Sequence, residues 1–457
     1  MKEHTTNIFR ILVLLALAII LFNAYFYDTQ KEDYYLDEKY SFFAANANLF
    51  SLKDIHRELK DSGYNLNQVI EIEKSKIVSE KGVRYSLDDV NSMLDAQKGD
   101  KYTIINTLLL DIFDSHPPLY YLLFNFVDSS ISGITLKSAG FLINIVALLV
   151  TCFLIYKIAS LLVGQSCAFF AMIFYGLGFD YINNVTYCRM YALLSMWFAL
   201  LVYLYLKWYQ HDYSFEDNGL LRWICVVEFL AMLTQYFALL FVLPLFVITI
   251  VIFRKRGKPV KRYLVHQIRT AVIFFLIWPV SIFQLIFDPR SADIRSASFF
   301  TGLPIRINYY LRLLKNSVFA GNKYFYALAI VAVIAFIAVN VISIHKSGEL
   351  QTFVHSDKFV YCIYIWGPAA FYYMFSVGFT PYIDPRYMMP VIPYIALVVV
   401  ISFWELLKMG THRNWICVAV MVCLIIFEYT LVRGLYPYYL YKTTSEKRDF
   451  LERYEGM

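Results

Sequence analysis

Residues 8–27 read IFRILVLLALAIILFNAYFY, an apolar run long enough to cross the hydrocarbon core of a bilayer, which takes about 20 residues. A polar segment, Tyr35-Leu36-Asp37-Glu38-Lys39-Tyr40-Ser41, follows a few residues later. Adjacent carboxylates beside a membrane segment need water or a cationic partner, because an uncompensated charge near hydrocarbon is costly. Position alone leaves two interpretations of Asp37 and Glu38: solvated charges on a surface loop, or part of a functional site.

Apolar residues dominate the whole chain and not only its first run. The residues A, V, I, L, M, F, W, Y and C make up 59% of the 457 and charged residues 17%, against roughly 45–50% apolar and 25% charged in soluble domains. The sequence therefore predicts an all-α polytopic membrane protein with a single transmembrane domain over residues 1–457. Ten further apolar runs lie near residues 136–157, 165–182, 190–208, 220–235, 237–253, 264–286, 324–344, 359–377, 388–406 and 414–432.

A shorter apolar segment at 117–134 decides the topology. If it spans the membrane, the basic cluster from Arg254 to Arg262 lies outside; if it lies on the outer surface, the cluster lies inside, as the positive-inside rule prefers. Polar residues interrupt the segment, and Pro117-Pro118 suits a helix start. We therefore predict an interfacial amphipathic helix here, about eleven spans, a cytoplasmic N-terminus and an extracytoplasmic C-terminus.

This topology gathers the long polar segments on the outer face. They are the first loop at 28–135, with juxtamembrane helices and a charged part at 45–102, the second loop at 287–323, and the tail at 433–457. The first apolar run lacks a well-placed small-residue cleavage site, so we expect it to remain as a signal anchor. We expect an integral protein of a bacterial plasma (inner) membrane whose active site faces the periplasm or the outside.

Several classes of chemistry find no support in the sequence. The net charge of +6 reflects basic loops between spans and not a basic stripe with interleaved aromatic residues, so no nucleic-acid partner is expected. The seven cysteines lie in or beside apolar runs and the eight histidines are scattered, which favours neither a disulfide framework nor a metal site. We predict no cofactor and no required metal.

The spacing of Asp37 and Glu38 limits what they can do. Neighbouring residues point about 100° apart on a helix or to opposite faces of a strand, so the pair is not expected to act as an acid and a base on one bond. One carboxylate can instead take a proton from an acceptor hydroxyl while a good leaving group departs unassisted.

Three further polar features fall on the predicted outer face. His116 precedes a helix start at headgroup level, where it could meet an anionic phosphate or only cap an interfacial helix. Arg189 and Arg386 each lie at the outer start of a predicted span. An arginine in this position either extends to lipid headgroups or neutralises a phosphate in a cavity. For Arg386, a local ion pair with Asp384 is the other interpretation.

Together these features resemble those of the GT-C membrane glycosyltransferases. The most similar branch is the bacterial group like protein O-mannosyltransferases and aminoarabinose transferases, over most of residues 1–210 and again about 380–400. The resemblance rests on Asp37-Glu38 after the first span, His116-Pro117-Pro118-Leu119-Tyr120-Tyr121 before the second, Arg189-Met190-Tyr191, and Arg386-Tyr387-Met388-Met389-Pro390.

The resemblance implies a transferase that uses a polyprenyl-phosphate-linked sugar on the extracytoplasmic side. Asp37 matches the family's general base and Glu38 its acidic neighbour. The residues that match positions near the lipid phosphate are His116, Arg189 and Arg386, and we add their aromatic neighbours Tyr120, Tyr191 and Tyr387 as expected contacts of phosphate or sugar. Direct displacement by an acceptor hydroxyl, on a protein, lipid or cell-wall glycan, predicts inversion at the anomeric carbon.

Two other functions remain open from the residues. A transporter or flippase would use ionisable groups within its spans, for which Glu228 and Glu428 are the candidates. A ligase or polymerase of lipid-linked oligosaccharides would use a related membrane scaffold, and the sequence separates it poorly from a glycosyltransferase.

Overall fold

The structure, a computed structural model, describes residues 2–46, 101–112, 116–216, 219–287, 302–347, 352–353, 356–380, 384–411 and 413–440, together with Gly63, Gln68 and Leu94. Every regular element in these ranges is a helix, which confirms the predicted all-α fold. Most of the charged 45–102 segment lies outside the described residues. So do the first half of the 287–323 loop and the tail after residue 440.

The helices follow the apolar runs of the sequence. They are α1 (Lys2–Asp28), α2 (Leu36–Asn46), α6 (Ile104–Ile112), α7 (Leu119–Ser130), α8 (Leu136–Leu162), α9 (Gln165–Gly176), α10 (Phe179–Thr186), α11 (Tyr191–Gln210), α12 (Gly219–Thr234), α13 (Leu239–Lys255), α14 (Val260–Ile277), α15 (Val280–Phe287), α17 (Leu303–Phe319), α18 (Lys323–Ser347), α20 (Asp357–Phe379), α21 (Ile392–Gly410) and α22 (Asn414–Arg433), with 3-10 turns η1 (Tyr236–Ala238) and η2 (Pro385–Tyr387).

Eight of the described helical segments are long and apolar enough to cross a membrane: α1, α8, α11, α13 with η1, α18, α20, α21 and α22. The chain is therefore an integral, multi-pass membrane protein. The other predicted spans take different forms. The run at 165–182 is divided into α9 and α10, the run at 220–235 forms the 16-residue α12, and Pro279 separates α14 from α15 because proline cannot continue the helical hydrogen bonds.

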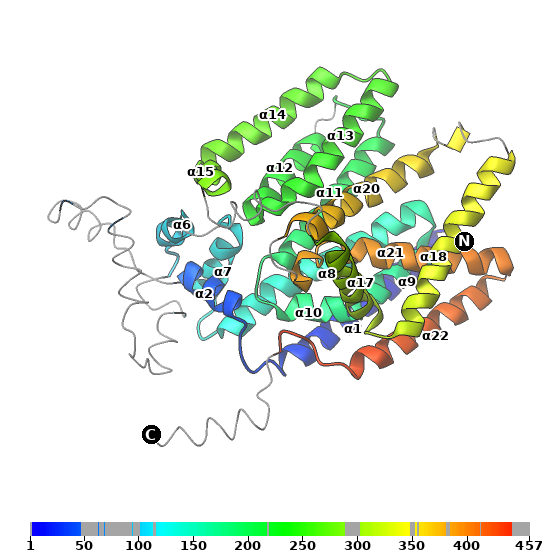
Figure 1. The fold of residues 1–457 in the computed structure, drawn as a ribbon, viewed down its shortest axis with the longest axis horizontal. Coiled ribbons are helices and arrows are strands. Elements are labelled where there is room, and N and C mark those ends of the chain that lie inside the picture. The colour runs from blue at the N-terminus through cyan, green and yellow to red at the C-terminus, as the bar shows by residue number, and fades with distance from the viewer. Residues whose placement is uncertain are drawn as a thin grey trace.

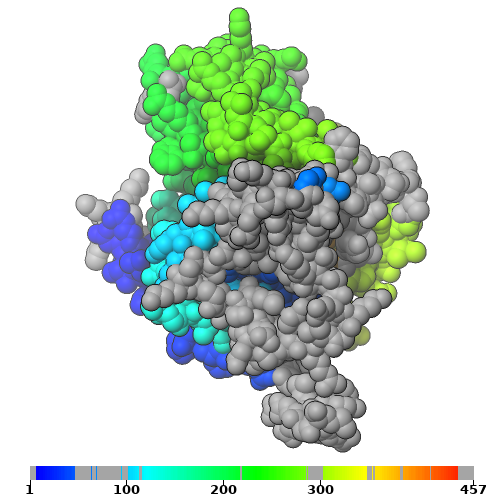
Figure 2. Space-filling model, turned by 90° about the vertical axis from the view of Figure 1, so that its left-hand side faces the viewer, coloured from blue at the N-terminus to red at the C-terminus, as the bar shows by residue number. Residues whose placement is uncertain are grey.

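Burial separates the centre of the bundle from its periphery (Figure 1). The apolar windows of α8 and α11 are 61% and 67% buried, whereas those of α18 and α22 are only 11% and 22% buried. Exposed apolar side chains on the outer helices are what a bilayer would cover. The helices α12 to α15 lie together on one side of the bundle, at the top of Figures 1 and 2, where α12 packs against α11 and α13 against α20.

Short helices gather at one end of the bundle. Helix α2 packs against α6 and α7, and α7 packs against the start of α8. Helix α7 has 12 residues, too few to cross a hydrocarbon core that needs about 20. A helix is present within the predicted 117–134 segment, and its interfacial position stays a prediction.

Helix α8 makes a close backbone approach that positions the loop between α10 and α11. Gly140 is so near this loop that an added Cβ would lie 2.5 Å from Cys188 Sγ and 2.7 Å from Cys188 Cβ. One turn along α8, Asn144 Nδ2 donates to the Tyr187 carbonyl oxygen at 2.6 Å. The residues around Cys188 are thus held directly against α8.

We predict that Gly140→Ala destabilises the protein by about 1–3 kcal/mol, the usual cost of overpacking a core. The measurement is the thermal unfolding midpoint of the purified protein in detergent. Gly410→Ala is the control, because its Cβ would meet no atom within 4 Å. Equal midpoints for the two variants would contradict the close approach.

Candidate active site

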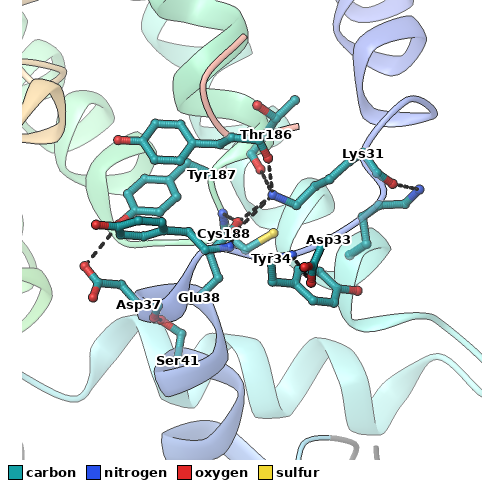
Figure 3. A network of polar contacts seen from close by, with 12 residues as sticks. Lys31, Asp33, Tyr34, Asp37, Glu38, Ser41, Thr186, Tyr187 and Cys188 are labelled. Atoms are coloured by element: carbon teal, nitrogen blue, oxygen red, sulfur yellow. Dashed lines mark hydrogen bonds and ion pairs between the residues drawn. The ribbon is translucent and has the colours of Figure 1, made fainter. Parts of the chain in front are cut away.

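Helix α2 places its two adjacent carboxylates in different environments. Asp37 and Glu38 both lie in the first turn of α2, where the helix dipole favours negative charge. The Glu38 side chain is fully buried, whereas that of Asp37 is 26% exposed. As expected from the helical offset, the two side chains point apart (Figure 3), and of the two only Asp37 is partly exposed.

Glu38 forms a buried ion pair with Lys31, and neither side chain is more than 1% exposed. Lys31 Nζ donates to the Glu38 carboxylate oxygens at 2.8 and 3.0 Å, and to the carbonyl oxygens of Thr186 and Tyr439 at 2.9 and 2.6 Å. The pair therefore joins the start of α2, the end of α10 and the C-terminal segment 434–440, as Figure 3 shows in part.

The remaining hydrogen bonds of Glu38 are also internal. It accepts from the backbone N–H of Tyr35 at 2.6 Å and from that of Cys188 at 2.7 Å. A carboxylate surrounded by donors in this way fixes the two segments that supply them. Glu38 thus anchors α2 to the loop that precedes α11.

Asp37 meets the side chain of Arg386. Arg386 Nη1 forms an ion pair with Asp37 Oδ2, and the Tyr187 hydroxyl donates to the same oxygen at 3.3 Å. The Arg386 side chain is 13% exposed, and its guanidinium lies 5.2 Å from the centre of the Tyr387 ring. A carboxylate and a guanidinium from opposite ends of the sequence therefore meet in a half-buried position.

Arg189 lies behind this pair and is almost fully buried. Its Nη1 donates to the Asp37 carbonyl oxygen at 3.1 Å, to Ser41 Oγ at 2.7 Å and to the Tyr121 hydroxyl at 3.2 Å. Its Nη2 lies 3.4 Å from His116 Nε2. Arg189 therefore connects α2, α7 and His116. Its positive charge lies against the backbone of Asp37, the residue that carries the exposed carboxylate.

The structure thus brings together the four residues singled out from sequence, Asp37, His116, Arg189 and Arg386. The predicted aromatic contacts are placed less uniformly. Tyr120 is completely buried and faces Tyr121, away from any surface. Tyr191 is also buried, and the Tyr387 ring meets it edge to face with the ring centroids 6.5 Å apart. Of the three tyrosines, only Tyr387 is partly exposed, beside Arg386.

Three contributors were not predicted as site residues: Lys31, Tyr187 and Tyr439. The Tyr439 ring stacks on Tyr187 at 4.0 Å, and its hydroxyl donates to Asp384 Oδ1 at 3.3 Å. Asp384 in turn accepts from the backbone N–H of Arg386 at 3.0 Å. The contacts of Tyr187 and Tyr439 join distant segments, so no spacing in the sequence signals them, whereas Lys31 lies only seven residues from Glu38.

Burial sets the protonation of the surrounding groups. It raises the pKa of the Tyr187 and Tyr439 hydroxyls well above the ordinary value, so both keep their protons and act as donors. Burial also raises the pKa of the Asp384 carboxyl, against the lowering effect of hydrogen bonds from the Arg386 backbone and the Tyr439 hydroxyl. The Cys188 thiol has its pKa raised by burial and stays protonated.

No group of three metal-ligating side chains occurs among the described residues.

The fold and site define a multi-pass helical membrane protein with a half-buried carboxylate and two arginines at one end of the bundle. No family model and no curated protein matches the sequence. Among solved structures, the chain is similar to ArnT from Cupriavidus metallidurans, both bound to undecaprenyl phosphate (16% identity, TM-score 0.46) and in the apo state (15% identity, TM-score 0.48). These matches cover 86% of this chain and 60% and 59% of those chains, so the chain spans about 60% of their length. Likeness at this level does not assign an activity.

We predict that Lys31→Met destabilises the protein by about 3–5 kcal/mol, because Glu38 would be left as a buried charge without its partner. The thermal midpoint in detergent measures the loss. The matched control is Lys39→Met, which removes the exposed Lys39–Asp33 pair at 3.3 Å and is expected to cost less than about 1 kcal/mol. Similar midpoints for the two variants would show that the buried pair is not a structural anchor.

Proposed function

We propose that the protein is a glycosyltransferase that moves a sugar from a polyprenyl-phosphate donor to an acceptor hydroxyl on the extracytoplasmic face of a bacterial inner membrane. The observation that carries the proposal is the position of Asp37: partly exposed, paired with Arg386, and backed by Arg189 and His116. A single carboxylate beside several cationic or hydrogen-bonding groups is the set that this chemistry needs.

The reaction requires one base because the donor already carries a good leaving group. The Asp37 carboxylate takes the proton of the acceptor hydroxyl as its oxygen attacks the anomeric carbon. The bond from that carbon to the phosphate oxygen breaks, and its electron pair leaves with the polyprenyl phosphate. Attack opposite the leaving group inverts the anomeric configuration.

Arg386 is the residue best placed to receive the phosphate. Its side chain is partly exposed, and a guanidinium presents a planar set of donors that fits phosphate oxygens. A donor phosphate would compete with Asp37 for these donors. Binding of the donor would therefore release Asp37 from the ion pair at the moment when the base is needed.

The other residues take supporting roles in this proposal. Arg189 is buried, so it adds positive charge and holds the Asp37 backbone and His116 in place. Glu38 anchors α2 through Lys31 and does not meet substrate. Tyr387, which is partly exposed beside Arg386, contacts the sugar or the lipid, whereas buried Tyr120 and Tyr191 support the groups around them.

We predict that Asp37→Asn lowers the transfer rate by about 100-fold or more, the usual contribution of a general base, while leaving the thermal midpoint close to wild type. The assay presents a panel of undecaprenyl-phosphate sugars with protein, lipid and glycan acceptors to purified protein, and measures release of undecaprenyl phosphate. Asp33→Asn, a nearby exposed carboxylate, is the control and should keep full activity. Full activity of Asp37→Asn would remove Asp37 as the base.

We further predict that Arg386→Gln raises the KM for the lipid donor about tenfold or more, with a much smaller change in the KM for the acceptor, because a charge-assisted contact to phosphate is lost. Steady-state kinetics with each substrate varied in turn separate the two effects. Arg312→Gln removes an exposed arginine of α17 and serves as the control for net charge. Equal changes for donor and acceptor would indicate that Arg386 is only structural.

A further inference from the structure

A second charged feature lies between α12 and α14, at the other end of the bundle from Asp37. Helix α11 starts beside the candidate active site and ends at Gln210, close to where α12 begins. A pocket of about 670 Å³ lies near the starts of α12 and α14. Its charged and titratable lining residues are Arg222, Lys261, Arg262, His266 and Arg269.

The pattern of α14 explains why these side chains share one surface. Lys261 and Arg269 are eight residues apart, and Arg262 and His266 are four apart, so both pairs lie along one face of the helix. The opposite face is fixed to the bundle: Gln267 Nε2 donates to buried Glu228 of α12 at 2.9 Å. The pocket therefore has walls held in place by packing.

Among the residues that the structure describes, positive charge in the pocket is not balanced by carboxylates. Within the described ranges, no carboxylate forms an ion pair with Arg222, Lys261 or Arg269. Arg262 donates to the Phe215 carbonyl oxygen at 3.1 Å and lies 4.8 Å from the centre of the Phe215 ring, so its partners are neutral groups and not a carboxylate. Like charges gathered around one concavity repel each other, so an anion bound there would be stabilised by all of them. The N-termini of α12 and α14 add to the same field.

Apolar surface continues directly from this pocket. Exposed side chains follow along α14, with Ile268 60%, Val272 50% and Leu276 74% exposed, and Trp223 of α12 is 62% exposed beside Arg222. Helix α14 lies on the outer side of its layer in Figure 1. A cationic pocket joined to an apolar helix face fits an amphiphile better than a free anion.

We propose that the pocket between α12 and α14 binds the phosphate headgroup of an anionic phospholipid, with its acyl chains along the exposed face of α14. The site is separate from the candidate active site, and the proposal does not depend on the proposed transferase activity. On the predicted topology it faces the cytoplasmic leaflet, where a basic pocket between helices is a recurring form of lipid recognition.

The test is a lipid titration of the full-length protein in detergent, read by native mass spectrometry. The probes are phosphatidylglycerol and phosphatidylcholine with identical acyl chains. The wild-type protein is expected to bind phosphatidylglycerol about tenfold more tightly. The triple variant Arg222→Gln/Lys261→Gln/Arg269→Gln should lose this preference, and Arg269→Gln alone should weaken it several-fold.

A matched triple variant controls for overall charge. Arg254→Gln/Lys255→Gln/Lys408→Gln removes three exposed cations from the same predicted face but outside the pocket, and it should keep the wild-type preference. Equal loss in both triples would overturn the proposal in favour of general electrostatic attraction. Glycerol phosphate that displaces phosphatidylglycerol at equal concentration would overturn it too, since the site would then bind a free anion.

Discussion

The buried ion pair between Lys31 and Glu38 is the constraint on which the candidate active site depends. Two charges removed from water are stable only if every donor and acceptor around them is matched, and here the partners come from the Thr186 and Tyr439 carbonyl oxygens as well. This requirement fixes the first turn of α2. Asp37 is carried on that turn, so the geometry of the exposed carboxylate follows from that of the buried one.

Sequence patterns were sufficient for features that depend on local chemistry. The apolar runs and the positive-inside rule predicted that Asp37, Arg189 and Arg386 share the outer face, and the structure brings them into contact. The sequence could not predict which of Asp37 and Glu38 is buried. The rotation of helix α2 about its axis is fixed by a hydrogen bond to a loop that lies about 150 residues away in the chain. Tyr439 carried no signal either, since its partners lie in distant segments.

The cationic side chains at the two ends of the bundle have different partners. At the end that holds Asp37, the cationic side chains of Lys31, Arg189 and Arg386 each meet a carboxylate or a hydroxyl of the protein. At the other end, Arg222, Lys261 and Arg269 face a pocket without such matching among the described residues. The contacts around Asp37 hold its site together before substrate arrives, whereas an anion bound in the basic pocket would add the charge compensation that the described residues do not supply.

The contact between Lys31 and Tyr439 spans 408 residues of the chain. During synthesis the N-terminal helix enters the membrane long before the segment that carries Tyr439 has left the ribosome. Until that segment arrives, Lys31 lacks one of its acceptors, and Tyr187 lacks the ring that stacks on it. Assembly of the candidate active site therefore waits for the segment that carries Tyr439, and a chain truncated before this segment would lack these contacts.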